Sequence, residues 1–338
     1  MKRIVFLLGV IGCGHTQPAA TPPALHSIAL PGAPADGVFM DYLAYDREHH
    51  RVWVPAGNTG SVDVVDVSSG AVTRIEGFPT QEMERRGRKR IVGPSSATVA
   101  GSYVYVGNRG DSSVCAVDAS SLQKAGCVTL DSMPDGLAYV AATKEVWVTT
   151  PRDKSIRILD VSSAGAPRLA GSMSFEGEPE GYAVDDGRGI FYTNLEDKDR
   201  TLAIDVKSRK ITQTWLPACG EDGPKGLALD TELQYLFVAC TDHVMVLDAG
   251  HEGKQLSKVD TGAGVDNIDY VPKRHELYAA AARAAKLTVA RVDAKGTLQA
   301  VAVVPTANGA RNAVATDDGA AYLTDSPEGK LLVVAPGK

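Results

Sequence analysis

Polar residues that could bind an ion or a ligand recur along the chain, each opening a copy of one short phrase. The seven residues, called the anchors below, are Asp41, Ser95, Asp135, Glu180, Lys225, Asp266 and Arg311, and Asn267 and Asn312 follow the last two. Hard cations such as Ca²⁺ prefer several oxygen ligands, so Asp135, Glu180 and Asp266 are candidate metal ligands. If the fold brings the anchors together, they could instead orient a small polar ligand, or pair with one another around a wet channel.

The spacing of the anchors indicates which elements position them. Successive copies are 54, 40, 45, 45, 41 and 45 residues apart, a period typical of β-propeller blades. An aromatic residue follows each anchor by 10–12 positions, in an expected second strand, and an aspartate follows six of them by 23–27 positions, where a third strand should end. The aromatic residues are Trp53, Tyr105, Trp147, Tyr192, Phe237, Tyr278 and Tyr322, and the aspartates are Asp66, Asp118, Asp160, Asp205, Asp248 and Asp293.

Three markers in phase predict an all-β, seven-bladed β-propeller of four-stranded antiparallel blades. The seventh copy breaks off after residues 331–334, without a fourth strand. We expect residues 26–30 to supply that strand, because pairing the first segment with the last removes an exposed sheet edge. A ring closed in this way predicts a monomer.

The innermost strand of each blade lines the channel of a propeller, so the anchors should form a rim at the channel mouth. The loops between second and third strands open on the same side, which we name the upper face. Several are charged, including Arg109 and Asp111, residues 152–154 and residues 196–200. Loops on a rigid scaffold often bind partners, although charged loops also serve solubility alone.

The first step of 54 residues contains an insertion on the upper face, at residues 82–90. Its basic residues are Arg85, Arg86, Arg88, Lys89 and Arg90. One interpretation is a docking loop for an anionic partner such as lipid headgroups, a polysaccharide or nucleic acid. The other is a flexible, solvated insertion.

Four cysteines lie within the repeats, and their positions predict two disulfides. Cys115 and Cys127 should oppose each other in the third and fourth strands of the second blade, at a separation that a disulfide can bridge. Cys219 precedes the fifth blade and Cys240 ends its second strand, on the same face. Buried reduced thiols are the alternative, and no cysteine or histidine spacing suggests a zinc site.

The N-terminus has the layout of a secretory signal: two basic residues and a short apolar run that ends at Gly12-Cys13. The run is too short to span a bilayer as a permanent helix. Residues 10–13 resemble the bacterial lipobox, which implies cleavage between residues 12 and 13 and lipidation of Cys13. Gly14, after the lipidated cysteine, implies outer-membrane sorting. Residues 13–24 would be a flexible tether and residues 25–338 the propeller. An ordinary signal peptide ending near a cysteine is the alternative.

The third-strand phrases at residues 64–67, 158–161 and 203–206 resemble those of YVTN-type bacterial β-propeller proteins. That resemblance implies architecture more than function. The phrases at residues 134–137 and 224–227 resemble strand openings of gluconolactonase-type propellers, which implies a calcium-dependent lactonase. Against this, Lys225 and Arg311 place positive charge where metal ligands are wanted.

Two functions are therefore expected from the sequence. The first is a non-enzymatic binding propeller of the cell envelope, attached to the membrane only by its lipid, that recognises a protein, a glycan or a small polar ligand. The second is the lactonase, with Ca²⁺ as its cofactor. The formal net charge of −6 makes a general nucleic-acid partner unlikely, and no serine-hydrolase, P-loop or dinucleotide motif occurs.

Overall fold

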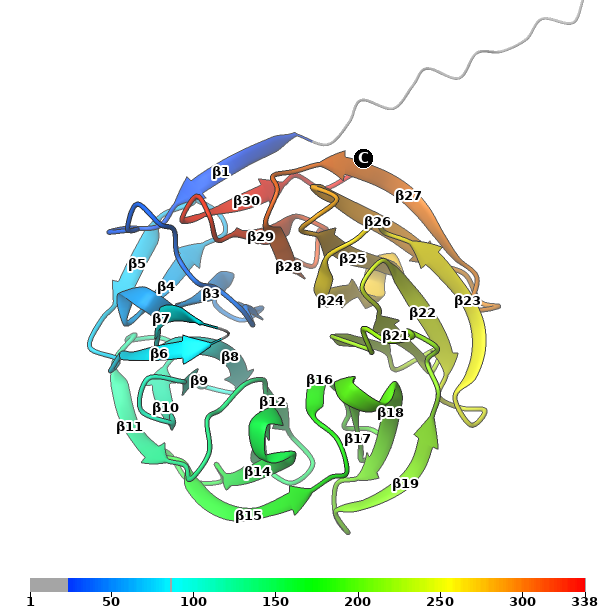
Figure 1. The fold of residues 1–338 in the computed structure, drawn as a ribbon, viewed down its shortest axis with the longest axis horizontal. Helices are drawn as coiled ribbons and strands as arrows, with labels where there is room; N and C mark the ends of the chain where they lie inside the picture. The colour runs from blue at the N-terminus through cyan, green and yellow to red at the C-terminus, as the bar shows by residue number, and fades with distance from the viewer. Residues whose placement is uncertain (1–23, 86, 338) are drawn as a thin grey trace, which may run out of the picture.

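The computed structural model describes residues 24–85 and 87–337. It contains seven four-stranded antiparallel sheets arranged in a ring around a central channel (Figure 1), so the predicted propeller and its blade count are confirmed. The only helical segments in these residues are single 3₁₀ turns, each of which connects two strands of one blade. None of these turns has the length and apolar character needed to cross a membrane.

The blades follow the predicted repeats, with the first strand of each innermost. Blade 1 contains β2 (Ala44–Asp46), β3 (Arg51–Ala56), β4 (Ser61–Asp66) and β5 (Val72–Ile75), and blade 2 contains β8 (Pro94–Ala100), β9 (Tyr103–Asn108), β10 (Ser113–Asp118) and β11 (Lys124–Thr129). Blade 3 contains β12 (Leu137–Val140), β13 (Glu145–Thr150), β14 (Ser155–Asp160) and β15 (Arg168–Ser174), and blade 4 contains β16 (Pro179–Asp185), β17 (Ile190–Leu195), β18 (Arg200–Asp205) and β19 (Lys210–Trp215).

The remaining blades continue the same pattern around the ring. Blade 5 contains β20 (Leu227–Asp230), β21 (Tyr235–Ala239), β22 (His243–Asp248) and β23 (Lys254–Asp260), and blade 6 contains β24 (Val265–Val271), β25 (Glu276–Ala281), β26 (Lys286–Val292) and β27 (Leu298–Pro305). Blade 7 contains β28 (Ala310–Ala315), β29 (Ala321–Asp325), β30 (Lys330–Val334) and β1 (Leu25–Ala29). The 3₁₀ turns are η1 (Gly57–Thr59), η2 (Pro151–Asp153), η3 (Glu196–Lys198) and η4 (Pro272–Arg274).

The hydrophobic core lies between neighbouring blades, and the aromatic markers form much of it. Trp53 of β3 packs in one cluster with Val104 and Val106 of the next blade. Trp147 of β13 lies against Phe191 of β17, with ring centroids 4.7 Å apart. Each aromatic thus joins its own blade to the adjacent one, which explains why it recurs once per repeat.

The ring closes through the N-terminal strand, as predicted. Strand β1 pairs antiparallel with β30, from Leu25 opposite Val334 to Ala29 opposite Lys330. The fourth strand of blade 7 therefore comes from the start of the chain. Cys13, with the signal and the tether up to residue 23, lies outside the described residues.

Both predicted disulfides are confirmed. Cys115 and Cys127 are directly opposed in β10 and β11, with Cα atoms 4.0 Å apart. Cys219 precedes blade 5 and is bonded to Cys240 after β21, with a Cα separation of 5.1 Å. The first disulfide ties an outer strand to its neighbour, and the second ties a loop of the upper face to the inner part of blade 5.

The insertion between blades 1 and 2 forms a β-hairpin, which the sequence had not predicted. Strands β6 (Gln81–Arg85) and β7 (Arg88–Val92) pair only with each other and lie in front of β8 and β9 in Figure 1. Charge pairing across the strands supports the hairpin, because Lys89 Nζ donates to Glu82 Oε1 at 2.8 Å. Arg86, between the two strands, lies outside the described residues.

Candidate functional site at the channel mouth

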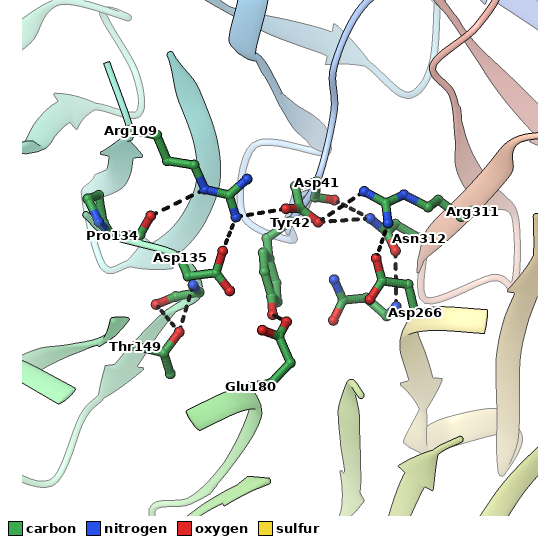
Figure 2. Close-up of polar contacts among 12 residues, drawn as sticks. Asp41, Tyr42, Arg109, Pro134, Asp135, Thr149, Glu180, Asp266, Arg311 and Asn312 are labelled. Carbon is green, nitrogen blue, oxygen red and sulfur yellow. Dashed lines mark hydrogen bonds and ion pairs between the residues drawn. The ribbon is translucent and has the colours of Figure 1, made fainter. Parts of the chain in front are cut away.

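The anchors converge at one end of the channel, where each inner strand begins. Figure 2 shows Asp41, Asp135, Glu180, Asp266 and Arg311 arranged around the opening. Close contact between the inner strands depends on the glycines that follow the anchors. A Cβ atom on Gly136 would lie 2.6 Å from the Tyr182 ring, and one on Gly226 would lie 2.8 Å from Asn267. The recurring Asp-Gly and Lys-Gly phrases are therefore packing requirements as well as polar positions.

Arg109 joins two anchors, Asp41 and Asp135. It comes from the loop between β9 and β10, and its Nη2 donates to Asp41 Oδ2 at 2.9 Å and also to Asp135 Oδ1. Its Nε donates to the carbonyl of Pro134 at 3.4 Å, and its guanidinium lies 5.7 Å from the centre of the Phe39 ring. Arg109 is thus a cation of the rim itself, held by contacts on several sides.

Arg311 and Asn312 connect blade 7 to blade 6 and to blade 1. Arg311 pairs with Asp266 through Nη1, and its Nη2 lies 3.7 Å from Asp41 Oδ1. Asn312 has a left-handed backbone at a β-bulge, with φ of 52°. Its Nδ2 donates to the carbonyl of Asp41 at 3.0 Å, and its Oδ1 accepts the backbone N–H of Asn267 at 3.0 Å.

Tyr42 crosses the channel from blade 1 to blade 4. Its hydroxyl donates to Glu180 Oε1 at 2.5 Å, and its ring stacks on Tyr182 with centroids 5.8 Å apart and planes 19° apart. Tyr42 is 5% exposed. Figure 2 shows the Tyr42 ring between Asp135 and Asp266, with its hydroxyl on Glu180.

Burial at the rim raises the pKa of two carboxyls. Burial, reinforced by the charges of Asp266 and Asp41, raises the pKa of Glu180 to about 8. Burial also raises the pKa of Asp266, although the Arg311 guanidinium opposes the shift. Near neutral pH, Glu180 is therefore largely protonated.

Lys225 and Ser95 contribute less to this network than their positions suggested. Lys225 Nζ pairs with Glu196 of η3, and its carbonyl accepts Asn194 Nδ2 at 2.6 Å. Ser95 is buried, and within the described part of the chain its Oγ has no hydrogen-bond partner. The same holds for Nδ2 of Asn267.

The three candidate calcium ligands do not gather around one point. Asp135 is bound by Arg109, Asp266 by Arg311, and Glu180 by the Tyr42 hydroxyl. Among residues 24–85 and 87–337, no group of three or more histidine, cysteine, aspartate or glutamate side chains is arranged to hold a metal ion. The rim as folded does not provide the ligand set that calcium requires.

A cavity of about 1110 Å³ opens on the upper face above the rim. Asp135, Glu180 and Arg109 lie at its base. The β1–β2 connection contributes Phe39, and further loops of blades 3, 4 and 7 complete the walls. The hairpin forms one wall with Met83, Lys89, Arg90, Ile91 and Val92. The basic insertion, predicted as a docking loop or a solvated segment, therefore borders the candidate site.

Three important residues of the site were not assigned to the rim from the sequence. Arg109 was recognised only as part of a charged upper loop, and Tyr42 and Tyr182 were not singled out. Tyr42 directly follows the first anchor and Tyr182 lies two residues after the fourth. An aromatic beside an anchor on an inner strand was the available signal, although the direction of its side chain depends on the curvature of the ring.

No protein-family model and no curated protein matches this chain. Solved structures match over nearly its whole length. A chain of the mitotic checkpoint complex covers 100% of it, with 16% identity and a TM-score of 0.72, and itself is covered in full. The match to streptogramin B lyase covers 94% of this chain and 99% of the lyase chain, with 13% identity and a TM-score of 0.71. Hydrazine synthase of Kuenenia stuttgartiensis covers 98% and 100%, with 15% identity and a TM-score of 0.72. At such identities the likeness concerns the fold alone.

Proposed function

We propose that this protein is a non-enzymatic binding propeller of the cell envelope, and that its upper-face cavity recognises a small polar ligand. The observation that carries the proposal is the cavity of about 1110 Å³ built directly over the paired rim. Ligand pockets of drug-sized molecules usually measure about 300–1,000 Å³, so the space suffices for a ligand of several groups.

The pairing within the rim favours binding over metal-assisted hydrolysis. Arg109 is bonded to Asp41 and Asp135, and Arg311 to Asp266. A lactonase would need several of these carboxylates free to share one ion, whereas here they fix one another and present a preorganised floor. Preorganised polar groups bind a ligand with little ordering cost.

The envelope location rests on two features of different kinds. The two disulfides suit an oxidising compartment outside the cytoplasm. Lipidation of Cys13, suggested by the sequence alone, would hold the protein at a membrane. Substitution Cys13→Ala should move the protein from the membrane fraction to the soluble fraction of the producing cells, and unchanged membrane association would contradict the anchor.

The binding function can be tested with a thermal-shift screen of amino acids, short peptides, sugars and small organic acids against the purified protein. Compounds that raise the Tm should lose their effect in Ile91→Asp, which places a charge in the cavity wall. Ile91 is 49% exposed, so the fold should tolerate the change. The matched control is Leu169→Asp, because Leu169 is 54% exposed on the outer strand β15, away from the cavity. Stabilisers that act equally on both variants would contradict the cavity as the binding site.

A further inference from the structure

The charged residues of the upper-face cavity are separated by depth. Glu178 and Glu180 precede and begin the inner part of blade 4, at the base of the cavity. Arg90 belongs to the hairpin that overlies the ring in Figure 1, and Arg152 belongs to the exposed turn η2. The base of the cavity therefore carries acids without a cation partner. Its exposed wall carries the two arginines together with two acids, Asp36 and Glu82, of which Glu82 is paired with Lys89.

The acids at the base have no cation to balance them. Glu180 is bonded to a hydroxyl, that of Tyr42, and in the part of the chain that the structure describes no lysine, arginine or histidine pairs with Glu178 or Glu180. The nearby cations are already committed: Arg109 to Asp41 and Asp135, and Lys225 to Glu196. Carboxyl groups without a cation partner favour a positively charged ligand group, which would shift Glu180 toward its carboxylate form.

The cations of the outer wall are equally unmatched. Within the described ranges no carboxylate lies within ion-pair distance of Arg90 or Arg152. Lys89, the neighbour of Arg90, is by contrast paired with Glu82 at 2.8 Å. Arginine binds carboxylates readily because its planar fork matches both oxygens. The cavity thus offers sites for two opposite charges that its own residues do not satisfy.

Apolar side chains also line the cavity. They are Phe39 from the β1–β2 connection, Met83 and Ile91 from the hairpin, and Met133 before blade 3. Aromatic and methionine side chains suit apolar groups of varied shape. A ligand with an ammonium group at one end, a carboxylate at the other and apolar groups between them would match all three surfaces.

We propose that the cavity binds a short peptide with a free amino terminus and a free carboxylate, its ammonium on Glu180 and Glu178 and its carboxylate on Arg152 and Arg90. This inference rests on the proposed function, since it names the ligand class of the same cavity. The peptide would enter with its amino terminus toward Glu180, whose partner Tyr42 is held in place by stacking on Tyr182.

The protonation of Glu180 gives this binding mode a measurable signature. Burial raises the pKa of Glu180 to about 8. The charges of Asp266, Asp41 and Glu196 add to the shift, and the hydrogen bond from the Tyr42 hydroxyl opposes it. An ammonium group beside it would favour the carboxylate, so near neutral pH binding should release a proton from Glu180 to the solvent. Calorimetry in two buffers of different ionisation enthalpy measures that release directly.

The decisive experiment is titration calorimetry with the tripeptide Ala-Leu-Ala and two modified forms of it. The unmodified peptide should bind, the N-acetylated peptide should bind at least about tenfold more weakly, and the C-amidated peptide several-fold more weakly, since losing one partner of a buried charge contact costs more than losing an exposed one. Glu180→Gln, which keeps the acceptor for Tyr42, should abolish proton release and reduce the penalty of acetylation, because only Glu178 then remains to bind the ammonium group. Glu48→Gln, on an exposed turn of the opposite face, is the matched control.

Two results would overturn the inference, and each is distinct from failure of the proposed function. Equal affinity for free and acetylated peptide would exclude the ammonium site. Absence of binding by all three peptides would exclude the ligand class, while screen compounds that depend on Ile91 would still support the cavity as a binding site. If screen compounds also ignore the cavity variants, the proposed function itself fails.

Discussion

The two ends of the ring use carboxylates in opposite ways. At the lower end, Asp66 accepts hydrogen bonds from the amides and hydroxyls of Ser68 and Ser69, all within its own turn. The Ser68 hydroxyl, with the other donors, lowers the pKa of Asp66 to about 2. At the upper end, Glu180 is bonded to Tyr42, 138 residues away in sequence, and burial raises its pKa to about 8.

This difference separates carboxylates that shape a blade from carboxylates that face a cavity. A turn aspartate is supported by donors that its own sequence supplies, so it stabilises each blade independently. A rim carboxylate depends on partners from other blades, and it is placed where unfavourable burial is tolerated. Perturbed groups of the second kind concentrate where proteins bind ligands.

The largest effect should come from removing a cation of the rim. Arg311→Met leaves Asp266 and Asp41 without that partner, and we expect unfolding free energy to fall by about 2–3 kcal/mol, less than for a fully buried pair because Arg311 is partly exposed. Urea denaturation measures the change. Adding Asp266→Asn should recover part of the loss, and a double variant that is simply additive would show that the two residues do not interact.

The upper end of the ring should determine how stability changes with pH near neutrality. The pKa of Glu180 is raised from 4.5 to about 8, so the folded state keeps a proton that the unfolded chain has lost. Its contribution is complete below pH 4.5 and is lost as the pH rises through 8. As the pH rises from 5 to 8, the urea midpoint of Glu180→Gln should therefore fall less than the urea midpoint of the wild-type protein. Parallel profiles would contradict the raised pKa.

A smaller effect is expected at acid pH from the lower end. Asp66 and Asp160 have pKa values lowered to about 2, through the hydroxyls of Ser68 and Ser162 first and further hydrogen bonds second. Their contribution is present above their ordinary pKa and is lost as the pH falls toward 2. Asp66→Asn should flatten the decrease in Tm between pH 4 and 2 and leave the neutral part of the profile unchanged. If Asp66→Asn lowered stability at neutral pH as much as Arg311→Met does, the two ends would not differ in the way described.

The smallest effect is expected from calcium. Because the rim carboxylates are already paired, millimolar calcium and then a chelator should leave the Tm of the purified protein unchanged, apart from ordinary salt effects that magnesium reproduces. A calcium-specific rise that disappears in Asp135→Ala would restore the metal site and the hydrolase hypothesis with it.

The fold could be predicted from the sequence because its information is periodic. Anchors, aromatics such as Trp53 and turn aspartates such as Asp66 each mark a fixed position in a unit of about 45 residues, so errors in one copy are corrected by the others. The closing strand followed from the same count, since the seventh copy lacks its fourth strand.

The candidate site could be predicted only in outline, because its contacts connect different copies. The meeting of Arg109 with Asp41 and Asp135 depends on how far a loop side chain reaches across the ring, which no repeat encodes. The direction of Tyr42 across the channel is set by the ring as a whole. The hairpin was obscured because charged residues occupy both of its strands and hide the alternation on which strand prediction depends.

The pairing of β1 with β30 has a consequence for the order of assembly. Strand β1 is synthesised about 300 positions before its partner β30. Until then blade 7 is missing an edge and the circle cannot be completed, so bringing the two ends together is a late and entropically costly step. A chain that lacks β30 would keep most of its blades but could not pair β1 to close the ring. Such a chain should be cleaved by proteases faster than the full chain.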